Sequence, residues 1–64
     1  MKITILQIRA HGDEDDVYVF EGWHDEDALM PFIKNWCNGF NLNYDDPDDT
    51  WFKTVHLSYF DKLL

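Results

Sequence analysis

Residues 25–39 have the sequence DEDALMPFIKNWCNG, which is the clearest helical pattern in the chain. The large apolar residues in this segment recur at i, i+3, i+4, i+7 and i+8, a spacing that places them on one face of an α-helix. We therefore predict one amphipathic helix over about residues 27–38. The residues on its apolar face are Leu29, Phe32, Ile33, Trp36 and Cys37.

Both ends of this helix carry recognisable signals. Asp25, Glu26 and Asp27 stand at the front, where carboxylates cap free N–H groups and oppose the positive end of the helix dipole. Pro31 is tolerated only near the start of a helix, so the regular part is predicted to begin no earlier than about Asp27. Gly39 stands where a glycine just past the C-terminus is expected.

The segment before the helix predicts a β-hairpin. Met1 to Ala10 is rich in β-branched residues, His11 to Asp16 is polar and turn-forming, and Val17 to Phe20 supplies the returning strand. The alternation of apolar residues in the first strand slips at Ile5 and Leu6. Two explanations remain open, a bulge or a strand covered on both faces.

The segment after the helix is harder to assign, and residues 50–60 could be strand or helix. Asp46-Pro47-Asp48-Asp49 is typical of a helix start and predicts a short helical turn near 47–53. Residues 55–59 alternate apolar and polar, which predicts a third strand. The expected fold is a single small α+β domain over residues 1–64, an antiparallel hairpin with a third strand packed against one helix.

Length and composition limit the classes of protein to which this chain could belong. With 45% hydrophobic residues, the 64-residue chain is expected to fold rather than to form a disordered acidic tail. Its single cysteine, Cys37, excludes an internal disulfide and fits a reducing compartment, so we expect a cytoplasmic protein. The apolar start is too short for a secretory signal, and nothing resembles a membrane span. A monomer and a weak homodimer both remain open.

The charge is concentrated rather than spread. The chain has thirteen acidic and five basic residues, for a net charge of −8, and twelve of the acids lie between Asp13 and Asp49 with one base, Lys34. Such a balance argues against direct binding to nucleic acid or anionic lipid, because both need Lys and Arg to neutralise phosphate. It favours a strongly basic protein partner, which would offset the self-repulsion of the acids.

Aromatic residues flank the acidic runs, and aromatic anchors within a charged rim are typical of a protein interface. Alternate residues of an extended strand lie roughly 6.6 Å apart, about the spacing of successive phosphates, so carboxylate rows could imitate DNA. An acidic inhibitor of a basic toxin would need the same charges. The candidate partner-binding residues are Asp13, Glu14, Asp15, Asp16, Glu21, Tyr44, Asp45, Asp46, Asp48, Asp49 and Trp51.

Metal and catalytic sites have weak support in the sequence. The segment from Asn41 begins the alternation of a calcium loop, but Asp46 stands in place of its glycine and Phe52 in place of its closing glutamate. The histidines and Cys37 match no zinc spacing. Cys37 lies on the apolar helical face, where a cysteine is usually a small buried hydrophobe. We therefore expect no metal, no cofactor and no catalytic residue, and a binding protein rather than an enzyme.

Residues 32–49, FIKNWCNGFNLNYDDPDD, resemble a small phage anti-CRISPR protein that blocks a single-protein type II CRISPR nuclease. The shared series is Phe-Ile, an aromatic residue, Asn-Gly, an aromatic residue, Asn, Tyr and an acidic run. The resemblance implies an acidic DNA mimic that occupies the PAM-reading surface of a CRISPR-Cas effector, with Tyr44, Asp46 and Asp49 as contact residues. Pro47 departs from the pattern, which has an acid there, and the chain lacks room for that protein's N-terminal helix.

Two other classes of protein fit the residues. One is an acidic immunity protein or antitoxin that neutralises a basic nuclease toxin by occupying its active site. The other is a metal-dependent regulatory module, which calcium titration would detect. The partner distinguishes the first class from an anti-CRISPR protein, because an immunity protein or antitoxin binds a toxin and not a CRISPR complex.

Overall fold

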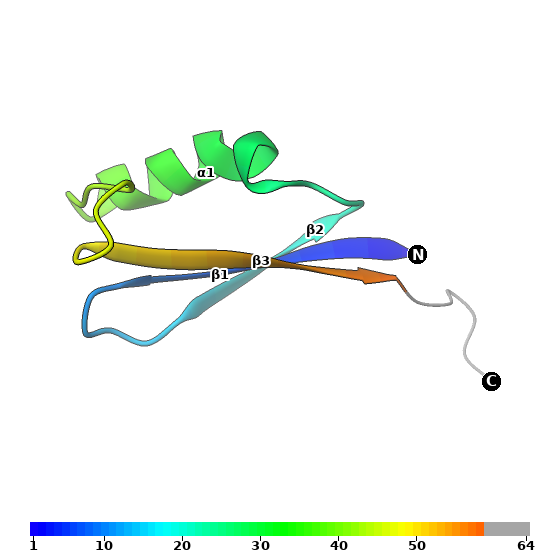
Figure 1. Ribbon diagram of the computed structural model, residues 1–64, viewed down its shortest axis with the longest axis horizontal. Helices are drawn as coiled ribbons and strands as arrows, with labels where there is room; N and C mark the ends of the chain where they lie inside the picture. The colour runs from blue at the N-terminus through cyan, green and yellow to red at the C-terminus, as the bar shows by residue number, and fades with distance from the viewer. Residues whose placement is uncertain (59–64) are drawn as a thin grey trace.

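The computed structural model describes residues 1–58 of the chain. It contains β1 (Lys2–Ala10), β2 (Asp16–Glu21), α1 (Glu26–Gly39) and β3 (Thr50–Ser58). The three strands form one antiparallel sheet in the order β2-β1-β3, and α1 lies across one of its faces (Figure 1). The predicted small α+β domain with a hairpin, a third strand and one helix is confirmed.

The central strand is β1, and its residues alternate between the two faces of the sheet. Leu6 and Ile8 face the helix and are fully buried. Pairing with β2 and with β3 runs without interruption, so there is no bulge, and the helix covers one face only. Within residues 1–58, neither explanation for the slip at Ile5 therefore holds. Ile5 is half-buried because Val19 and Val55 flank it on the face that α1 leaves uncovered.

The core lies between α1 and the sheet. Two T-shaped aromatic contacts extend it toward β2, with the ring of Phe32 4.8 Å from that of Tyr18 and 5.3 Å from that of Phe20. The periodicity of the helix thus identified the packed face, because the buried helical residues are those predicted to lie on it. The buried apolar residues are Leu6, Ile8, Leu29, Ile33 and Cys37.

The helix begins at Glu26, one residue earlier than predicted, and includes Pro31. Its C-terminus differs more. Gly39 is the last helical residue, and the left-handed residue is Asn41, with φ of 60°. The amide of Leu42 donates to the carbonyl of Cys37 at 2.9 Å and that of Asn41 to Asn38 at 3.2 Å, the two hydrogen bonds of a Schellman motif. Leu42 then packs against the core, which favours ending the helix here.

The third strand is longer than predicted. It starts at Thr50, so the helical turn predicted near 47–53 is wrong from Thr50 onward. A single turn remains before it, in which the amide of Thr50 donates to the carbonyl of Asp46 at 3.0 Å. Antiparallel pairing of Trp51 with Arg9 outweighs the local helix-start pattern. Tyr59, predicted as strand, lies outside the described residues. Within residues 1–58, α1 is too short and too polar to cross a bilayer.

Candidate interaction surface at the acidic end

Two acidic runs that are far apart in the sequence meet at one end of the sheet. Because β3 runs antiparallel to β1, the loop that follows β1 lies beside the loop that precedes β3. The amide of His11 donates to the carbonyl of Asp49 at 2.9 Å and joins the two loops. We call this region the acidic end; its eight acids are Asp13, Glu14, Asp15, Asp16, Asp45, Asp46, Asp48 and Asp49.

The loop before β3 is built by two of its own carboxylates. The Asp46 side chain accepts a hydrogen bond from the amide of Asp48 at 2.9 Å, and the Asp49 side chain accepts one from the amide of Asn43 at 3.1 Å. Asp46 and Asp49 are half-buried as a result, whereas Asp45 and Asp48 are exposed. The loop is held in one shape by Asp46 and Asp49, and Asp45 and Asp48 are the carboxylates that it presents.

The segment from the loop after β1 to the start of β2 also contains both engaged and unengaged acids. Asp15 forms an ion pair with Arg9 at 3.1 Å, and the Asp16 carboxylate accepts a hydrogen bond from the Trp36 indole at 3.3 Å. Asp13 and Glu14 are exposed. Among the interactions within residues 1–58, none engages the carboxylates of Asp13, Glu14, Asp45 or Asp48. These four are the acids available to a partner.

The α-helix strengthens the negative potential here. Its C-terminus lies at the acidic end, where Phe40 borders the same hollow as Asp13 and Glu14. The last turn of α1 has no basic residue to offset the negative end of the helix dipole. Arg9, close to this end of β1, is already paired with Asp15, and Lys34 lies over the ring of Tyr44. An approaching cation therefore meets a field that several carboxylates and a helix terminus produce together.

Aromatic rings lie among these acids. Trp51 is 37% exposed and stacks under the guanidinium of Arg9, 4.4 Å from the ring centre. Tyr44 is 36% exposed, and the ammonium of Lys34 lies 5.0 Å from its ring centre. Both rings are held by cations of this chain, which leaves their outer parts to contact a partner. Trp51, one of the candidate partner-binding residues, therefore borders the acidic end.

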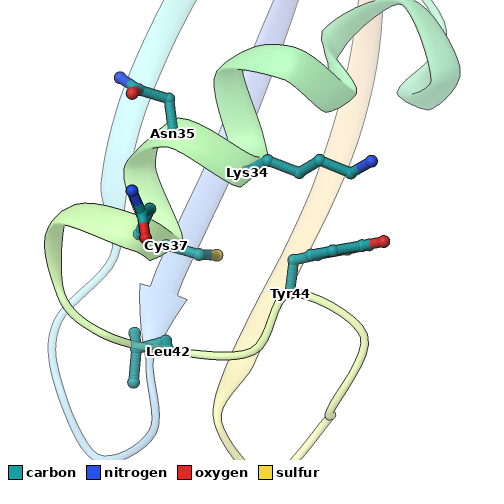
Figure 2. Close-up of a pocket in the computed structure, with 6 residues that line it drawn as sticks. Lys34, Asn35, Cys37, Leu42 and Tyr44 are labelled. Atoms are coloured by element: carbon teal, nitrogen blue, oxygen red, sulfur yellow. The ribbon is translucent and has the colours of Figure 1, made fainter.

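Two hollows open beside these rings. One, of about 410 Å³, lies between the two acidic loops and is lined by Arg9, His11, Gly12, Asp13, Pro47 and Trp51. The other, of about 440 Å³, lies between α1 and the loop before β3, where Lys34 and Tyr44 project side by side (Figure 2). The Cys37 thiol at its base is buried, 3.6 Å from the hydroxyl of Thr50. That contact fits packing rather than nucleophilic chemistry.

Glu21 is the candidate residue that the fold separates from the others. It ends β2 and is paired with Ile3, near the start of β1, whereas Asp16 begins β2 and is paired with Ile8. Glu21 therefore lies at the far end of the sheet. The acids at the front of α1 lie there too, and the Asp25 carboxylate caps the helix by accepting a hydrogen bond from the amide of Ala28 at 2.8 Å.

Sequence reasoning missed Arg9 and Phe40. Arg9 ties Asp15 to Trp51, and Phe40 is 58% exposed beside Trp36, with ring centres 4.7 Å apart. The i, i+4 spacing of Trp36 and Phe40 could have suggested this pair. The position of Arg9 depends on how β1 pairs with β3.

No three or more His, Cys, Asp or Glu side chains within residues 1–58 are grouped so that they could hold a metal ion. Comparisons of the chain with protein-family models, with curated proteins and with solved structures find no match.

Proposed function

We propose that this protein is an inhibitor whose acidic end binds the basic nucleic-acid-binding surface of another protein and excludes nucleic acid from it. The observation that carries the proposal is the meeting of two acidic runs, joined by the hydrogen bond between His11 and Asp49. Solubility alone would be served by acids spread over the surface with bases among them. Here the fold concentrates eight acids at one end.

Preorganisation supports the same function. The internal hydrogen bonds of Asp46 and Asp49 fix the backbone from which Asp45 and Asp48 project. A charged surface that is already ordered loses little conformational entropy when it binds. The repulsion among its carboxylates is relieved when lysines and arginines of a partner approach, which adds to the free energy of association.

The carboxylates do not imitate DNA in the way that the sequence suggested. At the acidic end only Asp16 lies in a strand, so there is no row of carboxylates along alternate strand positions. Mimicry would instead use two adjacent loops, each presenting exposed acids: Asp13 and Glu14 from one, Asp45 and Asp48 from the other. Such an arrangement can fill a basic site without following a helical phosphate path.

A CRISPR-Cas effector is the partner that we propose, on the basis of the resemblance of residues 32–49 to an anti-CRISPR protein. The site would be the surface where arginines and lysines grip the PAM duplex. Of the three contact residues that the resemblance implies, Tyr44 is exposed, whereas Asp46 and Asp49 are engaged in the loop. Asp45, which follows Tyr44 in the chain, and Asp48 are the exposed carboxylates of this loop.

The test is displacement of a labelled PAM-containing duplex from a guide-loaded, single-protein type II CRISPR nuclease, followed by fluorescence anisotropy. Wild-type protein is expected to displace the duplex. A variant that neutralises the four available acids should lose at least about tenfold in apparent affinity, because charge steering and contact are both reduced. Its substitutions are Asp13→Asn, Glu14→Gln, Asp45→Asn and Asp48→Asn.

A matched control removes four charges from the far end, through Glu21→Gln, Asp25→Asn, Glu26→Gln and Asp27→Asn. Asparagine caps a helix about as well as aspartate, so the fold is retained. The control should inhibit like wild type. If both variants lost inhibition equally, the effect would come from net charge alone, and this result would contradict the proposed site. Inhibition of a basic nuclease toxin, with the CRISPR nuclease unaffected, would assign the protein to the immunity class.

A further inference from the structure

The face of the sheet opposite α1 carries a second, different surface. Three rows of side chains cross it, and each row contains one residue from each strand. Arg9 and Trp51 lie on the same side of the sheet, beyond the row of Gln7 and next to the acidic end. We call this the uncovered face. Its rows are Val17–Gln7–Lys53, Val19–Ile5–Val55 and Glu21–Ile3–Leu57.

The uncovered face is mainly aliphatic and accessible. Val17, Val19 and Leu57 are 56%, 62% and 43% exposed, and Ile5 at the centre is half-buried. No element within residues 1–58 packs on it, because α1 lies on the other face. Antiparallel sheets often leave one face to water, but that face then carries polar residues. Six aliphatic residues among nine are instead typical of an interaction surface.

The charges on this face indicate which partner fits it. Its three rows carry one base and one acid, and the adjacent Arg9 is paired with Asp15, so the surface is neutral within a chain of net charge −8. A strongly basic protein would gain nothing from it. Lys53 is level with Gln7 on β3, and Glu21 is level with Ile3 on β2, so the two charges occupy opposite corners with Ile5 midway between them. That diagonal arrangement is self-complementary.

We propose that two copies of the chain associate through their uncovered faces. A two-fold axis that passes between the sheets at Ile5 places each Lys53 opposite Glu21 of the other copy, with the aliphatic residues buried between them. The strands of the two sheets then cross at a steep angle, one of the known modes of sheet packing. The acidic end lies outside this interface, because its loops begin beyond Arg9 and Trp51, which follow the row of Gln7.

The association would also add stability to a domain whose hydrophobic core is small. Five apolar side chains are buried in the described part of the chain, and domains of this size commonly need additional stabilisation. Burial of a second apolar layer supplies it without a disulfide, which the single cysteine does not allow.

Sedimentation velocity of the full chain from about 10 µM to about 1 mM tests the proposal. We expect a reversible shift toward twice the monomer mass of 7.7 kDa. Val19→Lys should shift the equilibrium toward monomer, because it buries an unpaired ammonium in the interface. Asn35→Lys, which adds the same charge to the exposed side of α1, should not. A monomer at every concentration, or equal effects of the two variants, would overturn the proposal.

A charge exchange tests the geometry without placing a charge among the aliphatic residues. Lys53→Glu and Glu21→Lys should each weaken the dimer, by roughly three- to tenfold, because each sets like charges opposite one another twice in the dimer. The double variant restores opposite charges and should recover the wild-type dissociation constant. Additive weakening in the double variant would place the interface elsewhere. Circular dichroism of all four proteins verifies that the fold is retained.

Discussion

At the scale of single residues, Thr4 is the polar group on which the core depends. Its side chain is fully buried, and the hydroxyl donates to the carbonyl of Gly22 and accepts from the amide of His24, both at 2.9 Å. We predict that Thr4→Val lowers the free energy of unfolding by about 1–3 kcal/mol, because it leaves both backbone groups unpaired. Urea denaturation measures this. Thr4→Ser, which keeps the hydroxyl, should lose about 1 kcal/mol or less.

Asn41 gives a second prediction at this scale. Its φ of 60° lies in the left-handed region, which alanine adopts at a cost of about 1–2 kcal/mol and glycine adopts freely. Asn41→Ala should therefore lower the melting temperature, and Asn41→Gly should not. Asn38→Ala is the matched control, because Asn38 lies within the helix, where alanine is the better residue. Equal responses at Asn38 and Asn41 would contradict the assigned helix end.

Residue identity alone could not distinguish the acids whose carboxylates hold the loop from the acids whose carboxylates are left unengaged. The sequence predicted a site among residues 45–49, and the structure brings that run together with Asp13 and Glu14. However, Asp46 and Asp49 use their carboxylates to hold the loop. These hydrogen bonds depend on the conformation of an irregular loop, which no repeating sequence pattern predicts. For the same reason the sequence predicted Gly39, rather than Asn41, as the left-handed residue.

At the scale of elements, the sequence predicted the helix and the strands whose apolar residues repeat at short intervals. The helix and the hairpin strands were found within one or two residues, because their apolar patterns repeat within a few positions. The strand order β2-β1-β3 could not be predicted, since it joins residues about fifty positions apart. The error at residues 50–53 has the same origin: strand pairing outweighed a local helix-start pattern.

The packing of α1 on the sheet gives the prediction for this scale. Ile33 is fully buried at the centre of the helix, against Leu6 and Ile8 in the core cluster. Ile33→Ala should destabilise the fold by about 2–5 kcal/mol, through lost burial and the cavity that remains. Because total stability of a small domain is of that order, the variant should be largely unfolded at 37 °C by circular dichroism. Asn35→Ala, on the exposed side, should stay within about 0.5 kcal/mol of wild type.

At the scale of the whole molecule, the distribution of charge has opposite consequences at the two ends. At the far end, Asp25 caps α1, and Glu26 and Asp27 lie in its first turn, where the helix dipole favours them. At the acidic end, the carboxylates repel one another and face the negative terminus of the same helix. Acids at the far end therefore stabilise the fold, whereas the unengaged acids of the acidic end, Asp13, Glu14, Asp45 and Asp48, oppose it.

This asymmetry predicts how stability responds to salt. Added NaCl, from about 10 mM to about 300 mM, shortens the screening length from roughly 30 Å to below 10 Å and should raise the free energy of unfolding of the wild type. The variant that neutralises Asp13, Glu14, Asp45 and Asp48 should be more stable than wild type at low salt and should gain less from added salt. Neutralising the four far-end acids should lower stability instead, because it removes favourable helix-dipole interactions. Urea denaturation of the three proteins at both salt concentrations measures these differences. If the two variants responded alike, repulsion would be a property of the net charge of −8 and not of the place where the fold brings the acids together.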